Sequence, residues 1–169
     1  MKPSPKLQSF VQQIAEQYGI DPLQKGAYLR LKMEGAQGAP GNLVIKNIDF
    51  GRVSIGHYLT ISGVRTADPE IVLYVAPETG SSEKKEEEPA WIPVEITQVL
   101  GGRRICVEFA LDSGDIRFFD LEGQAKLARF VEEVVAENLI GHGWLDHAVR
   151  IVELELPPFC VRRPGLRKG

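Results

Sequence analysis

Hydrophobic residues near the amino terminus recur at the spacing of an amphipathic helix, with glutamine and glutamate between them. The apolar positions are Leu7, Phe10, Val11, Ile14, Ala15 and Tyr18. Ser4 can cap this helix, Pro5 suits its first turn, and Gly19 favours its end because glycine readily adopts the left-handed conformation. The pattern therefore predicts one helix between Ser4 and Gly19.

A second helical pattern predicts a longer helix over residues 121–139, with Asp120 as its N-cap and Gly141 just beyond its end. Its inner stripe is expected to comprise Leu127, Phe130, Val131, Val134, Val135 and Asn138. Charged residues occupy the opposite side. The helix is therefore expected to pack one face on a sheet.

From Gly26 the apolar residues change from a helical period to a period of two. This alternation predicts strands at residues 27–33, 43–48, 52–61, 71–76, 91–100, 103–110 and 116–119, with a final strand at 150–156. Residues 62–69 are rich in turn formers, and Gly101-Gly102 is a hairpin signal. Strands this close in sequence favour an antiparallel meander. The predicted class is α+β: an N-terminal helix, a meander sheet of about seven strands, a long C-terminal helix and a final short strand.

The length of 169 residues favours a single domain spanning residues 1–169. Two segments differ in composition from the rest. Residues 77–90 contain no large apolar side chain, which predicts a mobile acidic loop, and residues 157–169 are basic and contain prolines, which predicts a mobile tail.

The formal net charge of -3 arises from an acidic body with basic residues near both ends of the chain. This distribution argues against a broad nucleic-acid surface on the body. Cys106 and Cys160 are too few and too far apart for a disulfide framework. The sequence also lacks a signal-like stretch and the roughly 20 apolar residues of a membrane-spanning helix. These features predict a soluble, cytoplasmic protein with no membrane partner.

His57 is a candidate for chemistry because alternation places it on the inward face of its strand, between Ile55 and Leu59. A buried imidazole needs a hydrogen-bond partner, which Asp68 or Glu70 could provide. One interpretation is a histidine satisfied within the core. The other is a general base that a carboxylate orients.

Arg65, Asp68 and Glu70 form a compact polar cluster between two predicted strands. Asp68-Pro69 favours a turn in which the aspartate binds nearby backbone amides, whereas a site role requires Arg65 or Glu70 to face His57.

Two histidines and an aspartate lie close together at His142, Asp146 and His147. On a continuous helix, His142 and His147 do not share a face, so we expect no metal site. The sequence also contains no Walker, GxGxxG, GxSxG or HExxH motif, and we expect no cofactor.

Aromatic and basic residues alternate on the predicted outward face of the first strands, at Tyr28, Arg30, Lys32, Arg52 and Tyr58. Tyr74 and Trp91 could continue this surface. Such a face could bind single-stranded nucleic acid by stacking and charge. Cross-strand pairing on a solvated face uses the same residue types, and it is the favoured interpretation because no RNP-like motif is present.

Several segments together resemble a small bacterial domain family of unknown function, often encoded on plasmids and phages. That family pairs an "IS-x-x-HY" strand with a later "DPE" and a "W-x-P". The corresponding segments here are Val53-Ser54-Ile55-Gly56-His57-Tyr58, Asp68-Pro69-Glu70 and Trp91-Ile92-Pro93, within roughly residues 26–100. The family has no established activity, so the resemblance implies no mechanism. It does imply that His57, Tyr58, Asp68, Glu70 and Trp91 form one spatial group.

These observations favour a non-enzymatic binding or accessory module, associated with a mobile element, whose partner is an unknown protein or a second copy of the chain. It would use the sheet face or the candidate ligand-binding residues His57, Tyr58, Arg65, Asp68, Glu70 and Trp91. Two alternatives remain open. One is a small-ligand binder or enzyme with His57 as its base, and the other is nucleic-acid binding through Tyr28, Arg30, Lys32 and Arg52.

Overall fold

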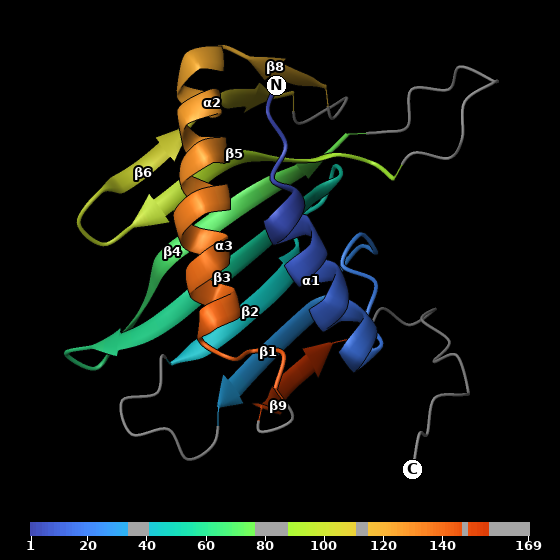
Figure 1. Ribbon diagram of the computed structural model, residues 1–169, viewed down its shortest axis with the longest axis vertical. Coiled ribbons are helices and arrows are strands. Elements are labelled where there is room, and N and C mark those ends of the chain that lie inside the picture. The colour runs from blue at the N-terminus through green and yellow to red at the C-terminus, as the bar shows by residue number, and fades with distance from the viewer. Residues whose placement is uncertain (34–40, 77–87, 111–114, 147–148, 156–169) are drawn as a thin grey trace.

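The computed structural model describes residues 1–33, 41–76, 88–110 and 115–146, and the backbone of residues 149–155. Two helical segments lie side by side across one face of a sheet (Figure 1). The first is α1 (Pro5–Tyr18). The second is one continuous helix made of α2 (Leu121–Phe130), the π-helical turn η1 (Val131–Val135) and α3 (Ala136–Gly141).

The sheet has seven antiparallel strands in the order β6-β5-β4-β3-β2-β1-β9 within the described residues. Six of them follow each other as a meander, and the last pairs with β1 at the far edge. A separate pair, β7 and β8, forms a two-stranded sheet. The bounds of the strands are β1 (Tyr28–Met33), β2 (Asn42–Asn47), β3 (Arg52–Ile61), β4 (Val64–Val75), β5 (Trp91–Gln98), β6 (Gly102–Ile105), β7 (Val107–Phe109), β8 (Ile116–Phe118) and β9 (Val149–Glu155).

The predicted α+β class is confirmed, including the N-terminal helix, the antiparallel meander and the long C-terminal helix. The apolar stripe of α1 is buried as expected, at Leu7, Phe10, Val11, Ile14 and Ala15. None of the helices in the described part of the chain has the length and apolar character needed to cross a membrane. The acidic segment 77–90 falls largely, and the basic tail 157–169 wholly, outside the described residues.

The prediction of a turn-rich segment at residues 62–69 is wrong. Only Ser62 and Gly63 form the turn, both with positive φ, and β4 already begins at Val64. Pro69 follows a cis peptide bond within the strand, next to the register shift between Gly56 and Tyr58. Proline cannot donate to the ladder, and such an irregularity is where a strand tolerates it.

The predicted strand at residues 103–110 is divided at Cys106. Its amide donates to Val94 O at 2.9 Å, after which the chain leaves the large sheet and forms the β7–β8 hairpin. The hairpin packs on Val72, Ile92 and Val94, which form a second hydrophobic cluster. Val72 alternates with Ile71 and Leu73 of the main core, so the hairpin covers the β4–β5 part of the sheet face opposite the helices.

The second helix begins as predicted, because the Asp120 side chain accepts a hydrogen bond from Gly123 N at 2.7 Å. Its inner stripe differs from the prediction. Phe130 is 36% exposed and Val134 is 41% exposed. The buried stripe instead repeats every four residues, at Leu127, Val131, Val135 and Leu139. An α-helix has 3.6 residues per turn, so residues spaced by four would gradually rotate away from the sheet. The π-helical turn η1 has more residues per turn, and it keeps these residues on the side that faces the sheet.

Candidate functional site

The sheet face opposite the helices, here called the open face, carries most of the polar candidates over β1–β4. Leu29 and Leu31 are fully buried on the helix side, so alternation puts Tyr28, Arg30 and Lys32 on the open face. Arg52 and Tyr58 lie on the same face. Tyr28 of β1, Lys46 of β2 and Ser54 of β3 are aligned across the sheet, so their side chains form one row on the open face. Glu70 of β4 lies opposite Gly56, two residues along β3, so its side chain belongs to the next row.

Glu70 is the centre of a polar network on this face. Its Oε1 accepts hydrogen bonds from Ser54 Oγ at 2.6 Å and Lys46 Nζ at 2.9 Å. Burial raises the pKa of the Glu70 carboxyl, but the hydrogen bonds from Ser54, Lys46 and Tyr58 outweigh burial and hold it below its ordinary value. Burial lowers the pKa of Lys46, yet the hydrogen bond and charge of Glu70 raise it overall. The two groups therefore hold each other in their charged forms.

Other cations near the open face are also engaged by their neighbours. The Arg65 guanidinium lies 4.6 Å from the centre of the Tyr58 ring, and that of Arg52 lies 4.2 Å from the centre of the Phe109 ring. Arg103 makes two hydrogen bonds to Glu95, at 2.6 and 3.1 Å. This arrangement favours cross-strand pairing over a free nucleic-acid platform.

Trp91 does not continue the open face, so that prediction is wrong. The side chain is 2% exposed and lies in the helix-side core. The reason is register: Trp91 pairs with Val75, whose side chain faces the helices, whereas Tyr74 pairs with Ile92 on the other side. Tyr74 does lie on the open side, with its ring 6.3 Å from that of Phe109.

His57 faces the helices, as predicted, and is 8% exposed. Its ring centre lies 5.6 Å from that of His142 and 6.1 Å from that of Trp144. His57 Nε2 is buried without a hydrogen-bond partner among the described residues. Burial lowers the pKa of His57, and the nearby His142 lowers it further. A hydrogen bond with the backbone of Asp68 and the charge of the Asp68 carboxylate raise the pKa, but they only partly offset this.

Neither candidate carboxylate orients His57. Glu70 lies across from Gly56 and turns to the open face, and the Asp68 carboxylate accepts from Val99 N at 3.3 Å. The expected spatial group of five residues is therefore wrong: Tyr58 and Glu70 lie on one face, and His57 and Trp91 on the other. Since His57 and Tyr58 are adjacent in one strand, period-two alternation alone separates them.

No group of three or more potential metal ligands is found in the part of the chain that the structure describes. His142 lies at the end of α3, beside His57, and His147 falls outside the described residues.

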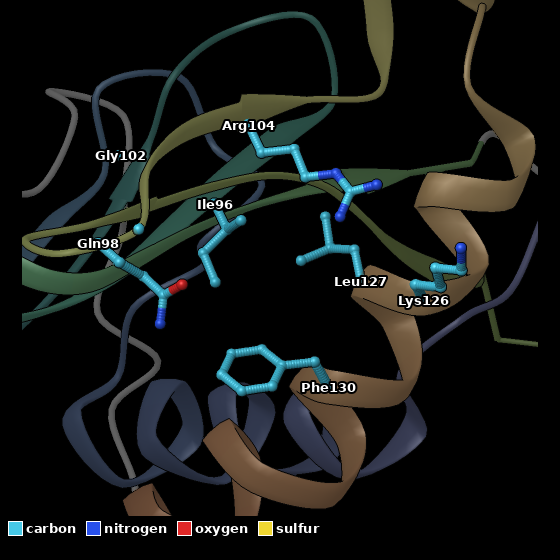
Figure 2. Close-up of a pocket in the computed structure, with 8 residues that line it drawn as sticks. Ile96, Gln98, Gly102, Arg104, Lys126, Leu127 and Phe130 are labelled. Carbon is cyan, nitrogen blue, oxygen red and sulfur yellow. The ribbon is translucent and has the colours of Figure 1, made fainter.

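A pocket of about 240 Å³ lies between α2 and the β5–β6 hairpin. Figure 2 shows Phe130 reaching from α2 towards Gln98, with the Arg104 guanidinium above Leu127. The residues that line this pocket are Ile96, Gln98, Gly101, Gly102, Arg104, Lys126, Leu127 and Phe130. It combines an apolar floor with two cations and two glycines at its rim.

The two segments that form this pocket also carry exposed apolar side chains, of which Phe130 lines the pocket itself. Val99 is 43% and Leu100 is 99% exposed in the β5–β6 turn, while Phe130 and Val134 are exposed on successive turns of the helix. We call the pocket together with these four residues the groove. The sequence pattern does not predict this groove, because a helical period of 3.6 places Phe130 and Val134 in the core. One residue in the sequence could have indicated an exposed apolar surface. Leu100 lies directly before the Gly101-Gly102 turn, where a side chain cannot reach the core.

No family model matches this chain, and neither a curated protein nor a solved structure has significant similarity to it.

Proposed function

We propose that this chain is a non-enzymatic binding module that holds a protein partner in the groove between α2 and β6. The observation that carries the proposal is a pocket lined by the exposed Phe130, between two segments that also expose Val99, Leu100 and Val134. Exposed apolar side chains are ordinary when scattered, but a contiguous group with a polar rim is typical of an interaction site.

The polar surfaces give less support to the two alternatives. On the face that would contact nucleic acid, Arg52 stacks on the ring of Phe109, and the ring of Tyr58 is already engaged by Arg65. An enzyme with His57 as its base needs a carboxylate partner, and Asp68 and Glu70 bind other groups instead. A bacterial, mobile-element setting and a cytoplasmic location belong to the same proposal, supported by the sequence resemblance and the cysteine usage.

The proposal can be tested by selecting binders from a phage library of random ten-residue peptides against the full chain. The affinity of each selected peptide is then measured by fluorescence anisotropy for the wild type and for Phe130→Ala and Leu100→Ser. We expect at least tenfold weaker binding in both variants. Leu23→Ala is the matched control, because Leu23 is 42% exposed and lies against α1, outside the groove. Circular dichroism confirms that each variant folds.

Two results would contradict the proposal: no enriched peptide, or enriched peptides that bind both groove variants as tightly as wild type. Binding of single-stranded DNA that falls steeply with salt and weakens on Arg30→Ala and Arg52→Ala would favour the nucleic-acid alternative instead.

A further inference from the structure

We infer that the partner segment is an extended peptide of alternating acidic and apolar residues that adds as a strand to the outer edge of β6, the edge that faces away from β5. This inference rests on the proposed function and specifies the chemistry of the partner. Strand addition to a sheet edge combines main-chain hydrogen bonds, which give affinity, with pockets for alternate side chains, which give specificity.

The first step is the edge itself. β6 is the end strand of the large sheet and pairs only with β5 in the described part of the chain. The hydrogen bond from Cys106 N to Val94 O extends the ladder in which Ile96 pairs with Arg104. In an antiparallel pair the hydrogen-bonded positions alternate, so the N–H and C=O groups of Arg103 and Ile105 point away from β5. They are positioned to pair with an added strand.

The second step is the direction of the side chains on β6. Arg104 lines the pocket on the helix side, whereas its neighbour Arg103 binds Glu95. An added strand has the same alternation, so every second side chain would lie over the groove, between Arg104 and the face of α2 that carries Phe130. Gly101 and Gly102 have no side chains, which lets a second backbone approach the start of the edge.

The third step is charge. Among the eight residues that line the pocket, two are basic, Arg104 and Lys126, and none is acidic. Arg104 makes one contact with Asp120 at 3.5 Å, and Lys126 pairs with Glu122 on the exposed helix surface. Exposed pairs of this kind contribute little and can exchange partners. Carboxylates of the added segment can therefore replace these contacts while its apolar side chains contact Ile96, Leu127 and Phe130.

The experiment uses the peptides selected on the full chain and asks two further questions of them. The first is their pattern: we expect apolar residues at every second position, with Asp or Glu among the enriched residues. The second is backbone pairing. Each peptide is synthesised with N-methyl groups on alternate residues, in two sets that differ by one position. One set blocks the amides that face β6 and the other blocks the amides that face solvent. We expect only one set to weaken binding, by at least tenfold.

Charge is tested by the double variant Arg104→Glu, Lys126→Glu. We expect this variant to bind the acidic peptides at least tenfold more weakly than the wild type does. We expect it to bind more tightly than the wild type to the same peptides with lysine in place of each acidic residue. The matched control is Lys32→Glu, because Lys32 is an exposed lysine on β1, far from β6 in the strand order. It should change the affinity for the acidic and for the lysine-substituted peptides by no more than twofold.

Failure of this inference is distinct from failure of the proposed function. Peptides that depend on Phe130 but have apolar residues every three or four positions, or that tolerate both N-methyl sets, indicate a helical or side-chain-only partner and overturn strand addition. Basic enriched peptides overturn the charge assignment. Concentration-dependent dimerisation of the chain that Phe130→Ala abolishes assigns the groove to a second copy and overturns the inference. Peptides that bind without dependence on Phe130 or Leu100 overturn the proposed function itself.

Discussion

The Glu132 carboxylate, which lies in the π-helical turn, accepts a hydrogen bond of 2.6 Å from Ser4 Oγ at the start of α1. The same carboxylate accepts from Lys6 N, at 3.2 and 3.1 Å for its two oxygens. Ser4 itself makes no side-chain cap of α1. The second helix therefore supplies the capping acceptor for the first, and this contact joins the start of α1 to the π-helical turn.

We predict that Glu132→Ala lowers the free energy of unfolding by about 1–2 kcal/mol, the usual effect of removing a cap. The measurement is urea denaturation followed by circular dichroism. Glu133→Ala is the matched control, since Glu133 is the exposed neighbour and should change stability by less than about 0.5 kcal/mol. Equal effects of the two substitutions would show that the carboxylate at position 132 does not cap α1.

Gly56 is a position on the open face where an added side chain would meet its neighbours. A Cβ there would lie 2.7 Å from Tyr58 Cε2 and 3.4 Å from Glu70 Cγ. The ring of Tyr58 would have to leave the strand surface and its contacts with Glu70 and Arg65. We predict that Gly56→Ala destabilises the fold by about 1–2 kcal/mol, with overpacking outweighing the entropic benefit of alanine.

Gly141→Ala is the control for this prediction, because nothing lies within 4 Å of an added Cβ at Gly141 and alanine favours helix. It should be neutral or stabilising by up to about 1 kcal/mol. In a Tyr58→Ala background, Gly56→Ala should lose most of its effect. An undiminished effect in that background would place the clash elsewhere.

How far the sequence predicted this fold depends on the range of the interactions involved. Alternation and helical spacing are local, so they identified α1, the meander and the cap at Asp120. The π turn that exposes Phe130, the register that buries Trp91 and the capping of α1 by Glu132 depend on how distant segments pack. No local pattern in the sequence encodes those relationships. The separation of His57 from Tyr58 is different, since their adjacency in one strand already required opposite faces.

Burial makes His57 a source of pH-dependent stability. Its pKa lies below the ordinary value of 6.5 in the folded chain because burial and His142 disfavour the imidazolium. As pH falls through about 6.5, the unfolded chain gains a proton that the folded chain does not. The contribution of His57 to stability is therefore present above about pH 6.5. It is lost as the pH falls towards the lowered pKa of His57 in the folded chain.

We predict that the free energy of unfolding of the wild type falls between pH 7.5 and 5.5, and that His57→Leu makes this fall smaller. Leucine removes the titrating group and leaves no unpaired nitrogen in the core. The range stays above the ordinary value of 4.5 for Glu70, whose pKa is lowered and whose contribution is lost only in more acidic solution. Parallel pH profiles for the two proteins would rule out His57 as the source.

The groove separates residues that hold the fold together from residues available to a partner. Leu127 forms its floor and is 4% exposed, whereas Leu100 at its rim is 99% exposed. We predict that Leu127→Ala costs about 2–5 kcal/mol because it leaves a cavity in the core. Leu100→Ser should change the free energy of unfolding by less than about 0.5 kcal/mol, because the side chain buries no surface within the chain. The measurement is urea denaturation of both variants. Destabilisation by Leu100→Ser of more than about 1 kcal/mol would mean that Leu100 supports the fold. Its exposure could then no longer be attributed to a binding role.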